Sequence, residues 1–303
     1  MKILLPLDII NPPELVMEYL QHLIPLDDRE VHLLYVNEAW PAYESVLGSS
    51  GHFPEDWRYK LEARAAQQLD LAAERLKGKC LKVSTEIVSG PPAMMIETVA
   101  RDEHCDITVM CPGKHAVVER VLLGSVSSKV LKHGPGTIVI GRPLEKPLER
   151  LSQIVIGVDG SANSIDALRR AVEIFKLNTS AAKILLVHSV DIADPVKYLS
   201  PIEFISALEQ NLLMEGESIL ADAKRILSDL QVKNVDVALV EGKPQGQIIK
   251  IAESSKADLV IIGAEGKTAI QHFLLGSVSH KVARYAPCAV AVVKRQHTPS
   301  EHQ

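Results

Sequence analysis

Three glycines and a serine in the C-terminal half of the chain are spaced so that they could hold phosphate. The segment from Gly263 to Ser277 reads Gly-x2-Gly-x9-Gly-Ser, and it joins a short apolar run to a helical pattern. Glycine lets backbone approach a ligand closely, and free N–H groups at a helix start attract phosphate. A structural interpretation stays open, in which Gly263 and Gly266 form a tight turn and Ser277 caps the helix.

Two other phosphate motifs are excluded by single positions. Gly266-Lys267-Thr268 resembles the end of a P-loop, but that motif would need glycine where the chain has Ile261. The turn at 157–164 reads GVDGSANS and lacks the Gly-x-Gly-x-x-Gly of dinucleotide-binding folds. Near the glycine segment the carboxylates are Asp159 and Glu265, which gives little support for phosphoryl transfer. We therefore predict no catalytic residues and no dedicated metal site.

The chain contains two copies of one sequence. LLGSVSSKV at 122–130 recurs as LLGSVSHKV at 274–282, an offset of 152, and KILLPLD at 2–8 matches QIVIGVD at 153–159. The same offset of 152 pairs Gly90 with Gly242, Pro92 with Pro244 and Asp106 with Asp258. A period this long indicates a duplicated globular domain, because solenoid units run about 20 to 50 residues. We predict domains at 1–143 and 151–295, joined by a short polar linker.

Each copy alternates apolar runs with amphipathic stretches. In the second copy the runs lie at 153–159, 183–190, 235–240, 257–263 and 289–293. Strands that are apolar on both faces and alternate with helices form a parallel sheet covered on both sides. The predicted fold class is therefore α/β, with two tandem Rossmann-like doubly wound domains and a five-stranded parallel sheet in each. Ligands of such sheets bind beyond the carboxyl ends of the strands, where Asp159, Ser189, Gly263 and Gly276 should meet.

Composition narrows the function classes. The chain has 303 residues and a formal charge of −5, and neither half is basic, which argues against nucleic acid and an anionic membrane surface as partners. No apolar stretch approaches the ~20 residues that cross a bilayer, and the first ten residues predict a strand rather than a signal peptide. The four cysteines form no Cys-x-x-Cys pair. Reduced thiols in the cytoplasm are the expectation.

The duplicated α/β domain, the strand that ends in Asp159 and the Gly-x2-Gly-x9-Gly-Ser segment resemble the universal stress protein family. Both copies carry the resemblance, so that it covers nearly the whole chain. It implies a Rossmann-like domain that binds ATP or AMP in some members and no nucleotide in others. It also implies pairing of the two domains through their final strands, as an intramolecular pseudo-dimer, with exchange between two chains as a homodimer left open.

Eight positions of the second copy take binding roles from this resemblance. Asp159 is implied to lie near the adenine and ribose, and backbone around Ser189 to lie against the base. Ile262 and Gly263 would border the ribose. Gly266 would pass under the phosphates, and Gly276, Ser277 and Val278 would surround them. The implied ligand is ATP, with ADP or AMP as alternatives and Mg²⁺ as an allowed companion. Each position also has a structural alternative: Asp159 closing a turn, Ser189 ending a strand, Val278 packing in the core.

The first copy departs from the pattern at the loop. Cys111 replaces the first glycine and Lys114 the second, whereas Gly124 and Ser125 remain. A side chain then stands where a ribose must approach, so we expect the first domain to be degenerate for nucleotide. A redox-sensing role for Cys111 is an alternative to a buried, inert thiol.

Three functions follow as hypotheses. The first is a stress-response regulatory protein that binds an adenine nucleotide in its second domain and acts through a protein partner rather than through turnover. The second is a slow ATPase, and the third is an interaction scaffold that needs no nucleotide.

Overall fold

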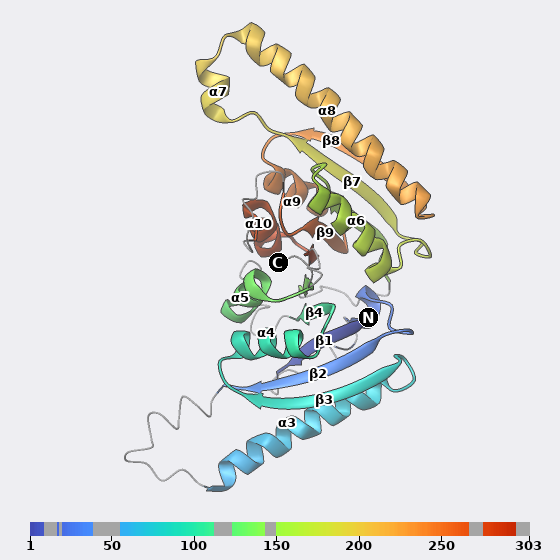
Figure 1. The fold of residues 1–303 in the computed structure, drawn as a ribbon, viewed down its shortest axis with the longest axis vertical. Coiled ribbons are helices and arrows are strands. Elements are labelled where there is room, and N and C mark those ends of the chain that lie inside the picture. The colour runs from blue at the N-terminus through green and yellow to red at the C-terminus, as the bar shows by residue number, and fades with distance from the viewer. Residues whose placement is uncertain are drawn as a thin grey trace, which may run out of the picture. The chain divides into compact units, whose positions relative to one another are not determined.

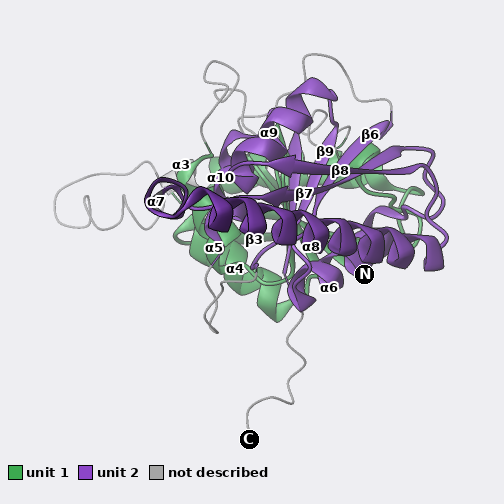
Figure 2. Ribbon diagram, turned by 90° about the horizontal axis from the view of Figure 1, so that it is seen from above, with its two compact units in different colours: residues 1–148 green, residues 149–303 purple. Residues whose placement is uncertain are grey.

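A computed structural model describes residues 1–8, 17, 20–38, 55–111, 123–142, 150–266 and 275–294. The chain divides into two compact units, Met1–Leu148 and Glu149–Gln303, which Figure 2 colours separately. Residues 143–149 of the predicted linker, which runs from about Gly141 to Leu151, lie outside the described residues, as do Lys114 and Lys267.

The first unit contains a five-stranded parallel sheet. Its strands lie in the order β3-β2-β1-β4-β5 and pair in parallel throughout. The described elements are β1 (Lys2–Leu7), β2 (Glu30–Asn37), α3 (Glu55–Leu76), β3 (Lys82–Ser89), α4 (Pro92–Asp102), β4 (Ile107–Met110), α5 (Ser125–His133) and β5 (Thr137–Ile140). Every residue of β4 and β5 is buried, as expected of strands covered on both faces.

The second unit repeats this architecture. Its strands pair in parallel in the order β8-β7-β6-β9-β10. Its elements are β6 (Gln153–Gly157), α6 (Ala162–Phe175), β7 (Lys183–Val190), α7 (Asp194–Leu199), α8 (Ile202–Asp229), β8 (Val235–Glu241), α9 (Pro244–Ser254), β9 (Leu259–Gly263), α10 (Ser277–Tyr285) and β10 (Ala289–Val293). In Figure 1, α6 and α8 cover one face of this sheet, and α9 and α10, which contact each other, cover the opposite face.

These sheets confirm the predicted fold class of two tandem doubly wound α/β domains. Two details differ from the sequence prediction. Strand β6 ends at Gly157, so Asp159 belongs to the turn after the strand, and α7 is a short helix that the apolar pattern did not indicate. Within the described part of the chain, no helix combines the length and apolarity that crossing a membrane would require.

The repeated Gly-x-Pro has a structural reason. Gly90 and Gly242 both adopt positive φ, at 148° and 118°, directly before the helices that Pro92 and Pro244 begin. The Gly242 N–H donates to the Val190 carbonyl at 2.8 Å, which ties the start of α9 to the end of β7. Glycine adopts this conformation at no steric cost, and proline suits a first helical turn.

The repeated aspartate is also structural. Asp258 Oδ2 accepts hydrogen bonds from Ser152 N at 2.6 Å, Ser152 Oγ at 2.7 Å and Gln153 N at 2.9 Å, so it holds the start of β6. In the first unit, Asp106 Oδ2 accepts from Lys2 N at 2.9 Å at the start of β1. The sequence repeat therefore preserves the anchor of each first strand.

We expect Asp258→Ala to lower the free energy of unfolding by about 2 kcal/mol, because three hydrogen bonds to a charged acceptor are lost. Urea unfolding followed by circular dichroism measures this change. Asp222→Ala is the matched control, since Asp222 is exposed and forms a surface ion pair with Arg225; its effect should stay within about 0.5 kcal/mol. Equal effects of the two variants would contradict the anchor.

Candidate functional site

The turn between β6 and α6 is held by Asp159. Its Oδ1 accepts from the Ser161 N–H at 3.0 Å and from Ser161 Oγ at 2.6 Å. Ser161 is the N-cap of α6, because its Oγ accepts from the Ser164 N–H at 3.1 Å. Ser164 Oγ in turn accepts from the Asp159 N–H at 3.2 Å. The carboxylate therefore closes a turn and is also fixed in orientation.

Gly266 lies directly against this carboxylate. A Cβ atom at Gly266 would stand 2.6 Å from Asp159 Oδ2, closer than any side chain tolerates. Gly266 does not have a positive φ, so the glycine is required by close approach and not by backbone conformation. The segment after β9 is thereby brought to the turn after β6.

Gly263 differs from Gly266 in its surroundings. A Cβ at Gly263 would lie 3.4 Å from the Glu265 carbonyl oxygen and 3.7 Å from Ala167 Cβ, which are ordinary van der Waals separations. Its φ is not positive either. None of the described residues therefore requires glycine here, because a Cβ at the carboxyl end of β9 would make only ordinary contacts with them.

The start of α10 closes the same edge. The Gly276 N–H donates to the Ala264 carbonyl at 2.8 Å, and Ser279 Oγ donates to the Gly263 carbonyl at 2.6 Å. Gly276 is the N-cap residue, and no side chain among the described residues makes a capping bond. Ser277 is exposed at the first helical position, so the alternative that it caps the helix is wrong.

The first N–H groups of a helix lack partners within the helix and carry its positive dipole end. In α10 they belong to Ser277, Val278 and Ser279. Val278 is half-buried, which is an intermediate position between the core packing and the ligand contact considered from sequence.

Two predicted positions have their side chains engaged elsewhere. Ser189, near the end of β7, donates its hydroxyl to the Gly242 carbonyl at 2.5 Å. Ile262 is buried, and its Cγ2 lies 3.1 Å from where a Cβ of Gly157 would be. Only the backbone of these residues is available to a ligand at the sheet edge.

Asn163 and Ser279, which the sequence did not single out, stabilise the carboxyl edge of the second sheet. Asn163 Nδ2 donates to Glu265 Oε2 at 3.3 Å, which links the first turn of α6 to the segment after β9. Ser279 supports Gly263, as described above. A signal for Ser279 was present, because Ser127 occupies its position in the first copy; the contact between Asn163 and Glu265, 102 residues apart, has no local signal.

The first unit carries a cysteine at the position of Gly263. Cys111 lies half-buried after β4, and burial raises the pKa of its thiol to about 12. Burial likewise raises the pKa of Cys105 to about 11. All four cysteines are free. Since the thiolate is the reactive form, these values favour the inert thiol over the redox sensor.

We expect Cys105 and Cys111 of the folded protein to react with iodoacetamide at pH 8 at least a hundredfold more slowly than in urea, where ordinary thiol pKa values near 8.5 return. Peptide mass spectrometry of samples quenched over time measures each rate. Rapid alkylation of Cys111 in folded protein would contradict the assignment and favour redox sensing.

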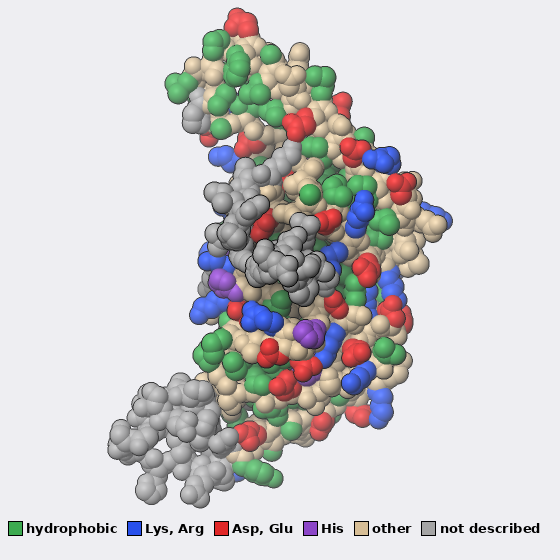
Figure 3. Space-filling model, in the orientation of Figure 1, with side chains coloured by type: hydrophobic (Ala, Val, Ile, Leu, Met, Phe, Trp, Pro, Cys, Tyr) green, Lys and Arg blue, Asp and Glu red, His purple; other side chains and the backbone are tan. Residues whose placement is uncertain are grey.

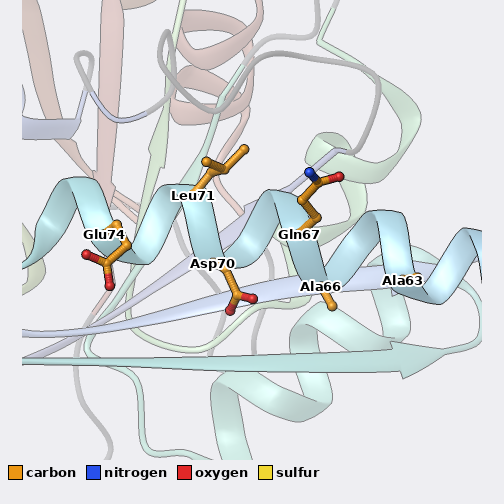
Figure 4. A pocket seen from close by; sticks show the side chains of 6 residues that line it. All are labelled: Ala63, Ala66, Gln67, Asp70, Leu71 and Glu74. Carbon is orange, nitrogen blue, oxygen red and sulfur yellow. The ribbon is translucent and has the colours of Figure 1, made fainter.

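A surface hollow on α3 is separate from this edge. It is lined by side chains of that helix alone (Figure 4): Ala63, Ala66, Gln67, Asp70, Leu71 and Glu74. It belongs to the first unit and includes none of the predicted binding residues.

The repeated sheets and the loop-to-helix edge define a tandem doubly wound α/β protein. The model of the universal stress protein family matches residues 1–142 and 151–294, and the chain belongs to this family.

The chain is similar to individual proteins of known sequence or structure. Universal stress protein MJ0531 of Methanocaldococcus jannaschii is 36% identical over 144 residues, which are 47% of this chain and 82% of that protein. A universal stress protein structure from Archaeoglobus fulgidus covers 97% of this chain and 96% of its own, with 20% identity and a TM-score of 0.65. A universal stress protein solved in complex with cAMP is 26% identical and covers 47% of this chain and 96% of its own, with a TM-score of 0.34.

Proposed function

We propose that this protein is a stress-response regulator that binds ATP, or another adenine nucleotide, in its second domain. It acts through protein partners in the cytoplasm rather than through turnover. The observation that carries the proposal is the combination, at one edge, of the start of α10, which no described side chain caps, and a glycine at 263 that no described residue requires. Together they offer N–H donors for phosphate and space for the group to which the phosphate is attached.

The roles follow the geometry of the edge. The N–H groups of Ser277 and Val278 bind phosphate, assisted by the exposed Ser277 hydroxyl, and Gly276 gives access to them. Gly266 passes under the phosphates, while the backbone of Ile262 and Gly263 borders the ribose. Asp159 contacts the ribose and adenine, and backbone around Ser189 contacts the base.

Asp159 and Glu265 are the carboxylates that would hold a Mg²⁺ ion accompanying the nucleotide. Both side chains reach this edge, since Asp159 lies against Gly266 and Glu265 is linked to Asn163. The ion would neutralise phosphate charge. Magnesium is held through one or two carboxylates and substrate phosphates in many nucleotide sites, which matches this pair.

Binding without turnover is supported by the position of Asp159. Phosphoryl transfer needs a base that orients the attacking group. Asp159 Oδ1 instead accepts two hydrogen bonds from Ser161, so this oxygen serves the turn.

The direct test is to denature freshly purified protein and quantify the released adenine nucleotide by anion-exchange chromatography. We expect close to one ATP per chain, which corresponds to a single site in the second domain. ADP or AMP in place of ATP would favour the slow ATPase. No nucleotide, together with no uptake of added ATP, ADP, AMP or cAMP, would contradict the proposal and favour the interaction scaffold.

A further inference from the structure

Helix α8 carries a row of apolar residues that continues past its covered part. Counted in steps of four, the row is Phe204, Leu208, Leu212, Gly216 and Leu220. Each step of four residues turns the row by about 40°, so the row winds around the helix and Phe204 lies on another face than Leu220. Gly216 and Leu220 are buried, Leu208 and Leu212 are only half-buried, and Phe204 is 55% exposed. The row therefore leaves the covered face of α8 toward the start of the helix, where Ile205 is buried and Phe204 is exposed.

The sheet covers only part of the length of α8. Gly216 packs closely against β7 and β8, because a Cβ there would lie 2.6 Å from Leu239 Cδ1 and 3.0 Å from His188 Cδ2. From Ser206 to Glu215 no residue of α8 is buried, a length of about 15 Å at 1.5 Å per residue. Figure 1 shows this part of α8 running past the ends of β7 and β8 toward α7.

Helix α7 adds further exposed apolar side chains beside the start of α8. Tyr198 is 83% exposed, Leu199 84% and Ile202 68%. The corner that presents them is ordered by backbone hydrogen bonds, from Ser200 N to Val196 O and from Ile205 N to Pro201 O, both at 3.1 Å. Figure 3 shows hydrophobic side chains gathered at this end of the second unit. We call the set of Tyr198, Leu199, Ile202, Phe204, Leu208 and Leu212 the α7–α8 patch.

Acidic side chains outnumber basic ones around the α7–α8 patch, and two of them are paired, Asp194 with Lys243 at 3.6 Å and Asp222 with Arg225 at 3.1 Å. Residues 191–223 contain seven acidic residues, Asp191, Asp194, Glu203, Glu209, Glu215, Glu217 and Asp222, and a single basic one, Lys197. A second copy of this surface would bring like charges together, and an anionic lipid surface would be repelled. A contiguous apolar surface with an acidic margin is complementary to an amphipathic helix that carries lysine or arginine.

We propose that the α7–α8 patch is the docking surface for a basic amphipathic helix of a partner protein. The apolar face of that helix covers the uncovered row of α8 and the end of α7, where the sheet no longer does. Its lysines or arginines face Glu203, Glu209 and Glu217. The inference supplies the protein partner of the proposed function, but it needs no nucleotide, so the absence of ATP binding would leave it intact.

The probe is a fluorescein-labelled synthetic helix of leucine and lysine with an amphipathic pattern, and its binding to the full chain is followed by fluorescence anisotropy without nucleotide. The matched control peptide has glutamate in place of every lysine. We expect the lysine peptide to bind, the glutamate peptide not to bind, and the affinity to fall as salt is raised to about 0.5 M. Equal binding of the two peptides would overturn the proposal.

Variants test whether the lysine peptide binds at the α7–α8 patch. Phe204→Ser combined with Leu208→Ser should weaken the lysine peptide at least tenfold, and Glu203→Lys combined with Glu209→Lys should weaken it similarly. Leu81→Ser removes a 69% exposed leucine of the first unit and should change the affinity less than twofold. Circular dichroism verifies that each variant is folded. Wild-type affinity in the Phe204→Ser, Leu208→Ser variant would overturn the assignment.

Two further measurements test whether a second copy of the chain or a lipid surface occupies the α7–α8 patch instead. Sedimentation velocity that detects a dimer abolished by Phe204→Ser and Leu208→Ser would assign the patch to a second copy instead. Cosedimentation with phosphatidylcholine or phosphatidylserine vesicles that is lost in the same variant would assign it to lipid. Either result would overturn the docking of a basic helix, and their absence supports it.

Discussion

Gly263→Ala is expected to weaken ATP binding at least tenfold while leaving the fold of the second domain intact. The protein offers room for the added methyl group, with nearest atoms at 3.4 and 3.7 Å. If the ribose lies against Gly263, the methyl group occupies volume that the ligand needs. A tenfold loss corresponds to about 1.4 kcal/mol of binding free energy. Isothermal titration calorimetry with ATP measures it.

The unfolding free energy of Gly263→Ala should change by less than about 1 kcal/mol, because no protein atom is displaced. Gly246→Ala is the matched control, since a Cβ at Gly246 on α9 meets nothing within 4 Å; ATP affinity should be unaffected by it. Gly263→Cys copies Cys111 of the first unit and should weaken binding further. Unchanged ATP affinity in both Gly263 variants would contradict the placement of the ribose against Gly263.

Gly266→Val should abolish ATP binding and also destabilise the second domain. Its Cβ would stand 2.6 Å from Asp159 Oδ2, so the carboxylate must move and the hydrogen bonds of Asp159 to Ser161 are disturbed. We expect a loss of about 1 to 3 kcal/mol in unfolding free energy, the usual range for a forced steric displacement. Urea unfolding and calorimetry with ATP measure the two effects separately.

A double variant separates the two causes. Asp159→Ala removes the atoms that the valine would strike, so Gly266→Val should cost less stability in the Asp159→Ala background than in the wild type. The difference is the coupling energy, expected at about 1 kcal/mol. ATP binding should not return, because the valine still lies where the phosphates pass. Additive stability effects would contradict the contact, and ATP binding by Gly266→Val would contradict the site.

Much of the fold was predictable because its signals are local. Apolar runs of strand length located β7, β8, β9 and β10 to within about two residues, and the offset of 152 revealed the duplication. Ser161 stands directly before an amphipathic stretch, where a serine N-cap is expected, and its hydroxyl makes the capping bond. Helix α7 was missed because six residues carry too little periodicity to distinguish a helix from a loop.

The residues of the candidate site were predictable from the sequence, but the structural role of each glycine was not. The spacing from Gly263 to Ser277 identified the segment, and its ligand remains a prediction. The sequence could not distinguish Gly266, which a neighbouring carboxylate requires, from Gly263, which no protein atom requires. That distinction depends on Asp159, more than one hundred residues earlier in the chain.

The amino-acid sequence by itself determined the two α/β domains, their strands and their family, because burial of apolar runs and helix capping depend on neighbours along the chain. Only the tertiary structure decided which positions are exposed or crowded. Phe204 and Ile205 are neighbouring apolar residues of α8, yet Phe204 is 55% exposed and Ile205 is buried. Where a sheet ends, and what lies against a glycine, is settled by segments that are distant in sequence and meet in the fold.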